Sequence, residues 1–315
     1  MNIVFFGSDD FAVSSLKLLI SKGRKIDYLV TQPDKKMGRG MHVGPTPVKL
    51  AAIDLNFKIF QPEDVNSPEA LKFLHELSPD LFIVIAYGQI LSSQLLEIPK
   101  VFSINIHASL LPKYRGAAPI NRVLINGEKE TGVTAIKMNE EMDAGDIIIQ
   151  NKITIDEEDC AITLRNKLSE LGASTLIEAI EKIENNNYKI TPQDAREITL
   201  APKMSKADGL INWKKSAKEI NNLIRGCYDW PGAFTYFSGK LLKIYKAQVF
   251  LQVEGNGKAN PGEIVKVIKD DIVVCTGGGD LMIEELQIEG KRRMLTKEFI
   301  TGHKIKAGDV FSENK

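Results

Sequence analysis

The sequence predicts two domains of different class, a doubly wound α/β domain followed by a smaller β-barrel. In the first half of the chain, short apolar runs alternate with amphipathic stretches of helical period, which is typical of β-α-β units. The run LFIVIA (81–86) is apolar at every position, as expected of a strand buried on both faces of a parallel sheet. Past Gly209, short β-like runs are separated by glycine turns. We therefore expect a Rossmann-like N-terminal domain and an OB-like C-terminal barrel.

Local signals set the expected element and domain boundaries. Thr46 precedes Pro47 and Ser67 precedes Pro68, and each pair predicts a helix with a capping side chain and proline at its first position. Gly23 is a candidate helix stop. A long amphipathic helix is expected over 161–186, and another near 215–226, in KSAKEINNLIRG. The predicted domains are residues 1–189 and 209–315, joined by a linker over 190–208.

Composition indicates an ordinary globular protein. The chain has 315 residues, of which 43% are hydrophobic and 26% are charged. No apolar run approaches the roughly 18 residues of a membrane helix, and the N-terminal MNIVFFG lacks the pattern of an export signal. The three cysteines show neither CxxC spacing nor a pairing framework, which fits a reducing compartment. We therefore expect a cytoplasmic protein.

Charge is balanced overall but unevenly distributed. The stretch from Gly209 to Lys315 contains 17 lysines and arginines against 13 aspartates and glutamates, a net charge of +4. Because the whole chain is neutral, the remainder carries −4. This mild asymmetry permits a polyanionic partner at the C-terminal end, and a solvated surface explains it equally well.

The strand FSINIH (102–107) carries the first candidate catalytic pair. Ligands of doubly wound sheets bind at the carboxyl ends of the strands. Alternation along this strand places Asn105 and His107 on one face, roughly 7 Å apart. An amide NH₂ and an imidazole N–H that converge from one face would stabilise the developing oxyanion of a carbonyl under attack.

A carboxylate completes the candidate set. The segment EEMDAGDIII places Asp143 and Asp146 in and after a turn between two strand-like runs, and Asp143 precedes Ala144-Gly145. A carboxylate beside His107 would favour the protonated ring, or would take a proton from an attacking amine. Each residue alone has a structural explanation, since aspartate before glycine commonly forms turns. The set of Asn105, His107 and Asp143 is less easily explained that way, and it needs no serine or cysteine nucleophile if the substrate supplies an amine.

The segment INIHASLLPKYRGAAPI, continued to IKMNEEMDAGDIII, closely resembles the folate-dependent formyltransferases. In that family the Asn, His and Asp, with the intervening SLLP element, form the catalytic core. The resemblance implies Asn105, His107 and Asp143 as catalytic residues and 10-formyltetrahydrofolate as formyl donor, with no metal. It also implies folate contacts from two short segments: Tyr87, Gly88, Gln89 and Ile90, and Ser109, Leu110, Leu111 and Pro112.

Three further stretches narrow the acceptor. VTQPDKKMGRGMHVGPTPVK (30–49) looks like the loop that methionyl-tRNA formyltransferases insert after the second strand. LAPKMSKADGLINW (200–213) resembles their linker, and YDWPGAFTYFSGKLLKIYKA with MIEELQIEGKRRM resembles their tRNA-binding barrel. The resemblance thus spans the chain and implies formylation of the α-amine of methionyl initiator tRNA by a monomer. It implies tRNA contacts from these cations: Arg39, Lys35, Lys36, Lys203, Lys206 and Arg292, with Lys291 and Arg293 beside them.

Two alternatives remain at this point, and one departure from the family pattern. An amino-sugar formyltransferase would share the donor and the catalytic set, but would lack the basic loop and the linker-barrel module. A catalytically silent RNA-binding protein would share the scaffold. Family members usually read Gly-Thr-Pro after the first strand, whereas this chain has Gly7-Ser8-Asp9-Asp10. Small and acidic residues can still turn the chain and cap a helix there, so we expect the fold to be kept.

Overall fold

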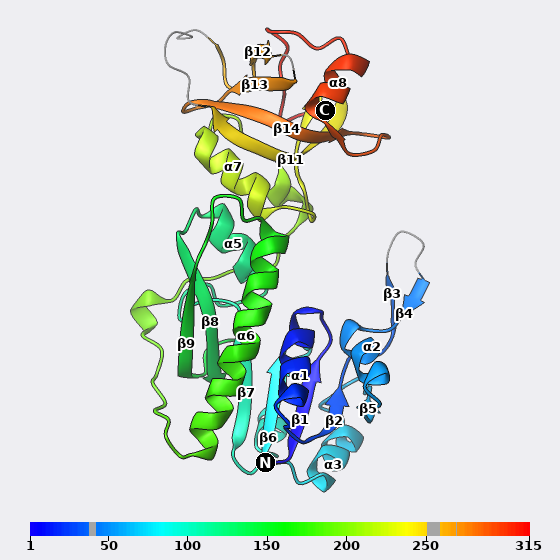
Figure 1. The fold of residues 1–315 in the computed structure, drawn as a ribbon, viewed down its shortest axis with the longest axis vertical. Helices are drawn as coiled ribbons and strands as arrows, with labels where there is room; N and C mark the ends of the chain where they lie inside the picture. Colours follow the sequence, from blue (N-terminus) through cyan, green and yellow to red (C-terminus); the bar gives the residue numbers. More distant parts are fainter. Residues whose placement is uncertain (38–41, 251–258, 269) are drawn as a thin grey trace. The chain divides into compact units, whose positions relative to one another are not determined.

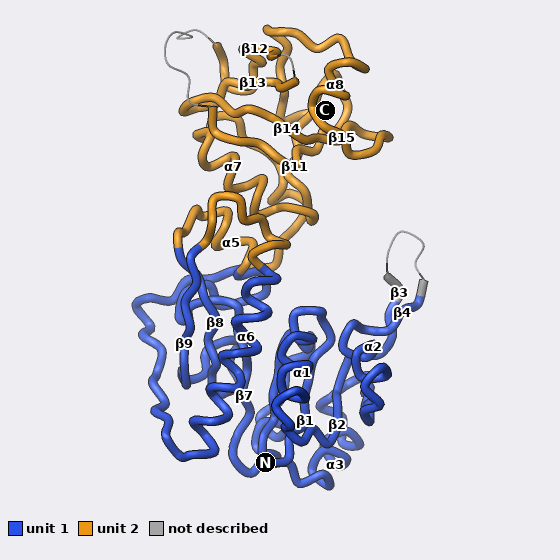
Figure 2. The backbone as a smooth tube through the Cα atoms, viewed as in Figure 1, with its two compact units in different colours: residues 1–119, 130–154, 165–201 blue, residues 120–129, 155–164, 202–315 orange. Residues whose placement is uncertain are grey.

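The computed structural model in Figure 1 describes residues 1–37, 42–250, 259–268 and 270–315. The chain forms two compact units that interleave in sequence (Figure 2). The N-terminal unit comprises residues 1–119, 130–154 and 165–201, and the C-terminal unit comprises 120–129, 155–164 and 202–315. Residues 190–201 of the predicted linker therefore belong to the N-terminal unit. The functional division at 189 and 209 stays a prediction.

The N-terminal unit is built on a sheet with the strand order β5-β2-β1-β6-β7-β8-β9 within the described residues. Its strands are β1 (Ile3–Gly7), β2 (Ile26–Val30), β5 (Ile59–Phe60), β6 (Leu81–Ile85), β7 (Phe102–His107), β8 (Glu130–Lys137) and β9 (Asp146–Thr154). The pairs from β5 to β7 are parallel, as expected, whereas β8 pairs antiparallel with β7 and β9 antiparallel with β8. A separate hairpin of β3 (Lys35–Met37) and β4 (His42–Gly44) follows β2.

Helices connect and flank these strands. They are α1 (Phe11–Ser21), α2 (Pro47–Asp54), α3 (Pro68–Glu76), α4 (Ser93–Leu96) and α6 (Ala161–Glu184), whereas α5 (Pro119–Ile125), between β7 and β8 in the sequence, falls almost wholly in the C-terminal unit. The two predicted caps are confirmed, because the Thr46 side chain accepts from the N–H of Lys49 and the Ser67 side chain accepts from the N–H of Ala70. Gly23 lies just past α1 with φ +68°, the left-handed conformation that glycine adopts at helix ends.

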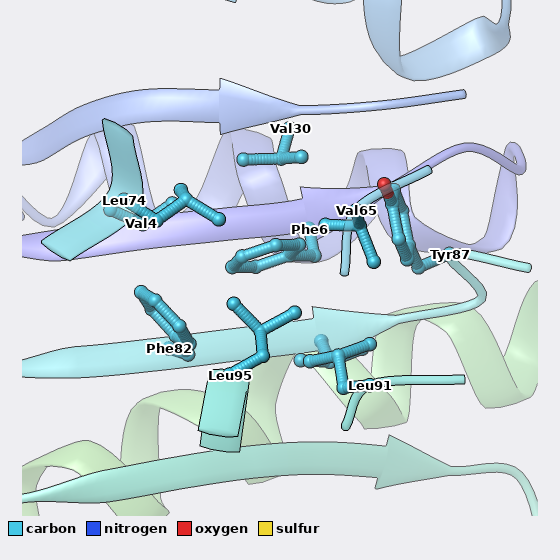
Figure 3. Close-up of a cluster of buried hydrophobic side chains, with 10 residues drawn as sticks. Val4, Phe6, Val30, Val65, Leu74, Phe82, Tyr87, Leu91 and Leu95 are labelled. Carbon is cyan, nitrogen blue, oxygen red and sulfur yellow. The ribbon is translucent and has the colours of Figure 1, made fainter. Parts of the chain in front are cut away.

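Both faces of the central strands are buried, as the uninterrupted apolar run predicted. Every residue of β1 and β6 is buried. Figure 3 shows one face, where Phe6 makes edge-on contacts with Phe82 and Tyr87, and Leu74 of α3 and Leu95 of α4 belong to the same cluster. On α6, Gly172 lies close to Ile106 of β7. Helices on both sides thus hold the sheet rigid at the strand ends.

The C-terminal unit contains a second, antiparallel sheet with the order β10-β11-β14-β13-β12, and β15 pairs with β14. Its strands are β10 (Ala233–Phe237), β11 (Lys240–Phe250), β12 (Ile264–Ile268), β13 (Asp271–Cys275), β14 (Asp280–Ile288) and β15 (Met294–Leu295), with helices α7 (Ala217–Gly226) and α8 (Thr296–Gly302). Two 3₁₀ turns, η1 (Ala195–Glu197) and η2 (Lys206–Gly209), precede α7.

The C-terminal segment closes this sheet toward a barrel. Ser312 exchanges two backbone hydrogen bonds with Tyr236 of β10, at 2.9 and 3.0 Å. The N–H of Phe311 donates to the carbonyl of Gly262 and the N–H of Ile264 donates to the carbonyl of Asp309, both at 2.8 Å. One short segment therefore satisfies backbone groups at both edge strands, β10 and β12, as closure of a sheet requires.

No helix in the described part of the chain combines the length and the apolar character needed to cross a membrane.

Replacing Phe6 by Ala is expected to lower the free energy of unfolding by about 3–5 kcal/mol, because the change opens a cavity in a fully buried, close-packed site. Denaturant unfolding followed by fluorescence and circular dichroism would measure it. Ile53→Ala, at a side chain that is 56% exposed, is the control and should change the value by less than about 0.5 kcal/mol. Equal effects of the two changes would contradict this description of the core.

Candidate active site

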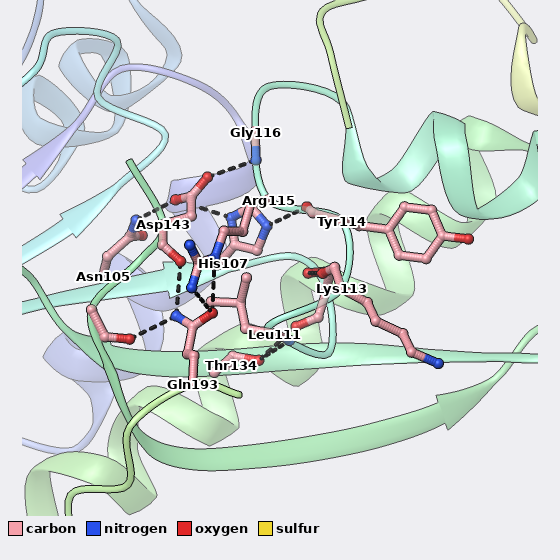
Figure 4. A network of polar contacts seen from close by, with 12 residues as sticks. Asn105, His107, Leu111, Lys113, Tyr114, Arg115, Gly116, Thr134, Asp143 and Gln193 are labelled. Carbon is pink, nitrogen blue, oxygen red and sulfur yellow. Dashed lines mark hydrogen bonds and ion pairs between the residues drawn. The ribbon is translucent and has the colours of Figure 1, made fainter. Parts of the chain in front are cut away.

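The carboxyl end of β7 carries the predicted pair of Asn105 and His107. Asn105 and His107 lie two residues apart at the carboxyl end of this strand, so both side chains project from the same face (Figure 4). His107 is buried, with 7% of its side chain exposed, and Asn105 is partly exposed. The sheet thus delivers an imidazole and an amide to one place, as the alternation predicted.

Asp143 joins this pair from the turn between β8 and β9. Its Oδ1 lies 3.3 Å from His107 Nδ1 and accepts from Asn105 Nδ2 at 3.4 Å. Its Oδ2 accepts from the backbone N–H of Gly116 at 2.9 Å. The structure therefore brings together the three side chains that the sequence grouped, while Asp146 begins β9 and pairs in register with Lys137.

The turn that carries Asp143 is tightly constrained. Asp143 has φ +54°, in the left-handed region that non-glycine residues rarely occupy. A Cβ on Gly145 would lie 2.0 Å from the carbonyl oxygen of Lys137, so only glycine fits there. The backbone, more than the side chain's own preference, thus points the carboxylate toward the end of β7.

The Asp143 carboxylate is stabilised in its ionised form. Burial raises its pKa. The hydrogen bond and charge of His107, the Gly116 N–H and the charge of Arg115 lower the pKa by more than burial raises it, so the net pKa lies below its ordinary value of 3.8. Because the folded-state pKa is depressed, the resulting stabilisation is present above the unfolded pKa and is lost as pH falls through the folded value. Near neutral pH the group is a carboxylate and accepts hydrogen bonds only.

The His107 ring faces acceptors on both sides. Nδ1 faces the Asp143 carboxylate, and Nε2 lies 2.9 Å from the carbonyl oxygen of Tyr114. Each ring nitrogen thus faces an oxygen that can accept a hydrogen bond, and the two contacts together fix the orientation of the ring. Tyr114 itself has φ +62°, so its carbonyl is held in place by an unusual loop conformation. Sequence reasoning did not identify this carbonyl.

The SLLP segment lies mostly inside the loop that follows β7. Ser109 and Leu111 are buried, and the Ser109 hydroxyl donates to the Lys113 carbonyl at 2.6 Å. The Thr134 hydroxyl donates to the Ser109 carbonyl and accepts from the Leu111 N–H. These bonds fix the shape of the loop, and the predicted folate contacts from this segment stay a prediction.

The segment from Tyr87 to Ile90 follows the carboxyl end of β6, at the same end of the sheet as the carboxyl end of β7. Gly88 has φ +90°, and Ile90 is 68% exposed, which is unusual for so large an apolar side chain. Gln89 instead braces a neighbouring segment, because its side chain accepts from the N–H of Val65 at 2.9 Å and donates to the Glu63 carbonyl at 3.0 Å.

Ser8, from the unusual segment after β1, ties three strand ends together. Its hydroxyl donates to the Tyr87 carbonyl at 2.8 Å and accepts from the Gln32 N–H at 3.1 Å, so it links the ends of β1, β6 and β2. Asp9 accepts from the Phe11 N–H at 2.9 Å and, with Asp10, pairs with Arg165. The departure from Gly-Thr-Pro thus keeps the turn, as expected.

Gln32, just past β2, was not singled out from the sequence. Its side chain is 93% buried, yet its Nε2 has no hydrogen-bond partner within the described residues. The hydroxyl of Tyr87, a 2% exposed residue, is in the same situation there. Buried polar groups are normally paired, so these two groups, which follow β2 and β6 on either side of β1, are candidates to bind a polar ligand. Position after a predicted strand was the only signal that sequence offered.

The predicted tRNA-binding cations lie in several different elements. Lys35 is exposed in β3 and its Nζ donates to Gln32 Oε1 at 2.7 Å, and the backbone of Lys36 pairs with that of Val43 in β4. Arg39 lies outside the described residues. Three others are exposed: Lys203, Lys206 and Arg292, the last of which pairs with Glu298 at 3.0 Å.

Arg293 has a different environment from its neighbour Arg292. Its guanidinium is bound by both carboxylate oxygens of Glu285 and lies over the rings of Tyr228 and Tyr245, 5.0 and 4.4 Å from their centroids. These contacts neutralise its charge and occupy its faces. The expectation that Arg293 attracts phosphates is therefore replaced by a role in packing β14 and β11.

Family models match both parts of the chain. The model described as formyl transferase matches residues 1–180, and the model of the formyl transferase C-terminal domain matches residues 203–304. The chain belongs to the formyl transferase family. Asn105, His107, Asp143 and the Tyr87–Ile90 segment all fall within the first match, and the antiparallel sheet falls within the second.

Curated relatives align with nearly the whole chain. A methionyl-tRNA formyltransferase of Caldanaerobacter subterraneus subsp. tengcongensis is 47% identical over 98% of this chain and 99% of its own. One of Thermodesulfovibrio yellowstonii is 49% identical over 98% and 99%, respectively. This family member is therefore an enzyme of the formyltransferase class.

Solved structures show the same fold. WlaRD, a sugar 3N-formyl transferase crystallised with dTDP and 5-N-formyl-THF, superposes with a TM-score of 0.68 at 24% identity over 93% of this chain and 99% of its own. HypX from Aquifex aeolicus, in complex with tetrahydrofolic acid, gives 0.62 at 19% identity over 95% and 46%. The predicted fold classes, a parallel-dominated α/β sheet and a separate antiparallel sheet in the C-terminal part, are confirmed.

Asp143→Asn is expected to lower kcat for formyl transfer at least about 10²-fold, because an amide cannot accept from His107, Asn105 and the Gly116 N–H together. Steady-state assays near neutral pH would measure the change. Asp146→Asn is the matched control and should stay within about twofold of the parent. A comparable loss in both variants would contradict the assignment of Asp143.

Proposed function

We propose that this formyltransferase transfers the formyl group of 10-formyltetrahydrofolate to the α-amine of methionyl initiator tRNA, giving formylmethionyl-tRNA for translation initiation. The observation that carries the proposal is the similarity, over 98% or more of the chain, to curated proteins named methionyl-tRNA formyltransferase. The cluster of Asn105, His107 and Asp143 supplies chemistry that suits the reaction.

The proposed mechanism uses the substrate's own amine as nucleophile. The neutral amine attacks the formyl carbon, a C–N bond forms, and the formyl oxygen becomes negative in a tetrahedral intermediate. Collapse of that intermediate breaks the bond between the formyl carbon and N10, and the proton lost by the amine ends on N10 of tetrahydrofolate. Model α-amines titrate near pH 7.7–8.0, so a useful fraction is already neutral at physiological pH.

The residues of this chain act on the oxygen and on the geometry. An amide carries two N–H donors, and the bond to Asp143 uses one of those of Asn105, which leaves the other for the oxyanion. His107 would donate from Nε2, in competition with the Tyr114 carbonyl that this nitrogen faces. Asp143 would hold the ring and stabilise its charge. Loss of one oxyanion donor typically costs about 10²–10³ in rate.

The strand ends beside this cluster fit a folate head group. A pterin presents donors and acceptors at the edge of a flat ring, and Gln32 Nε2 and the Tyr87 hydroxyl are buried without partners among the described residues. The Gln32 amide lies 3.9 Å from the position of a Cβ on Gly88, the nearest atom to that open position. We therefore place the donor against the segment from Tyr87 to Ile90, with SLLP residues on its other side.

The tRNA is proposed to bind through lysine and arginine side chains. Lys35, Lys36 and Arg39 belong to the insert around the β3–β4 hairpin, and Lys203, Lys206 and Arg292 belong to the C-terminal unit. Lysine and arginine attract phosphates without regard to sequence, and a guanidinium can also stack on a base. We propose that the enzyme acts in the cytoplasm, where charged initiator tRNA is used, and as a monomer.

The direct test is formylation of methionyl initiator tRNA by the purified protein with 10-formyltetrahydrofolate, followed by release and mass analysis of the amino acid. A nucleotide amino sugar serves as a second acceptor in parallel. Formylmethionine is the expected product. Formylation of the sugar alone would overturn the acceptor, and folate binding without either product would favour a silent RNA-binding protein.

His107→Ala is expected to lower kcat by about 10²–10³-fold or more while tRNA affinity stays within about twofold, because the ring acts on the reacting oxygen and is not among the proposed tRNA contacts. Filter binding would report the affinity. His75→Ala, at an exposed position in α3, controls for loss of an imidazole. A parallel large loss of tRNA binding in His107→Ala would sink this division of roles.

Arg39→Ala is expected to raise KM for methionyl-tRNA by about tenfold and to leave the dissociation constant for folate unchanged, the effect of losing one side-chain contact to nucleic acid. Arg196→Ala removes the same charge from an exposed arginine that pairs with Asp194, and should have little effect. Unchanged kinetics in Arg39→Ala would refute the role of this loop.

A further inference from the structure

The 191–201 segment, part of the predicted linker, runs along both loops of the candidate active site. Thr191 exchanges backbone hydrogen bonds with Ile147 in β9, at 2.8 and 2.9 Å. Farther along the segment, the Thr199 carbonyl accepts from the backbone N–H of Arg115 at 2.9 Å, and the Ala201 N–H donates to the Arg115 carbonyl at 2.7 Å. The Thr199 hydroxyl also accepts from the N–H of Tyr114 at 2.8 Å. All of these residues belong to the N-terminal unit.

Gln193 is the residue of this segment whose side chain reaches both loops at once (Figure 4). Its Nε2 donates to the carbonyl of Asp143 at 2.8 Å and to that of Gly145 at 2.7 Å. Its Oε1 accepts from Nε and Nη2 of Arg115 at 3.0 and 2.8 Å. A side-chain amide has two N–H donors and two acceptor lone pairs, and here all four are used.

The four hydrogen bonds of the Gln193 amide constrain two segments that contact the catalytic residues. The two carbonyls belong to the turn that holds Asp143 in its left-handed conformation, which costs energy and persists only where surrounding contacts enforce it. Arg115 lies between Tyr114, whose carbonyl meets His107, and Gly116, whose N–H meets Asp143. The Gln193 amide therefore binds both the turn that carries Asp143 and the loop whose Tyr114 carbonyl contacts His107.

We infer that Gln193 is a positioning residue for formyl transfer: by joining the Asp143–Gly145 turn to the Arg115 loop, it holds the Asp143 carboxylate in register with His107 and Asn105. The inference rests on the proposed function for its kinetic consequence and on the described contacts for its structural one. Gln193 is only partly buried, so its role differs from that of a core residue whose loss unfolds the protein.

Gln193→Met tests the inference, because methionine keeps the length of the side chain and removes all four hydrogen bonds. We expect kcat to fall by about 10²-fold, the cost of a small misplacement of catalytic groups, with KM for methionyl-tRNA and for the donor within about twofold. Near-UV circular dichroism at the assay temperature would establish that the variant is folded. Thr191→Ala, an exposed position in the same segment, keeps the backbone pairing and should match the parent.

Gln193→Glu separates the two halves of the contact. A glutamate still accepts from Arg115, but it cannot donate to the carbonyls of Asp143 and Gly145 and places negative charge against them. We expect it to lose as much kcat as Gln193→Met. Activity of Gln193→Glu within about twofold of the parent would overturn the inference, as would an effect confined to KM.

Hydrogen exchange supplies a readout that does not depend on turnover. In Gln193→Met, peptides that cover residues 113–118 and 141–147 should exchange faster than in the parent, whereas peptides from β1 and β6 should not change. Unchanged exchange in the two loops would overturn the inference even if the parent formylated nothing. Failure of the parent alone to formylate methionyl-tRNA would overturn the proposed function and leave this structural prediction to be judged by exchange.

Discussion

The carboxylate of Asp143 is the group on which the arrangement of the candidate active site depends. It accepts from a side chain at each of two positions of β7 and from a backbone N–H in the loop that follows. Because these donors come from different segments, displacement of the turn by about an ångström would break contacts to all of them at once. The surrounding contacts outweigh the cost of burying the charge, as the lowered pKa of Asp143 shows. The site is therefore arranged around the ionised Asp143 carboxylate, whose direction is set by the backbone conformation of its turn.

The sheet and its connections make this placement possible. Burial of β1 and β6 on both faces fixes the strand ends, and β7 inherits that rigidity through its parallel pairing with β6. β8 pairs antiparallel with β7 and ends with Lys137 opposite Ile104, so the turn before β9 starts beside the middle of β7, and Asp143 reaches Asn105 and His107 from there. Catalytic groups on strand ends are held more precisely than groups on long loops.

Those parts of the fold and the candidate site that depend on residues close in sequence could be predicted. Helix caps at Thr46 and Ser67 and the alternation of Asn105 and His107 depend on local rules, and the structure agrees with them. The antiparallel direction of β8 was not predicted, because strand direction depends on the end of the sheet from which the chain enters the strand. Gln193 was not predicted either, since its four hydrogen bonds join residues 48 to 78 positions away. Nor could charge alone tell Arg293, which is bound by Glu285, from an exposed arginine.

The most direct test of the account is a high-resolution crystal structure of the protein with a stable analogue of 10-formyltetrahydrofolate. The central claim is that the end of β7 and the Asp143 turn form the place where the formyl oxygen becomes negative. The account predicts that this oxygen lies within hydrogen-bond distance, about 3.2 Å or less, of Asn105 Nδ2 and a ring nitrogen of His107. A donor bound with its formyl group well beyond that distance from both side chains would contradict it.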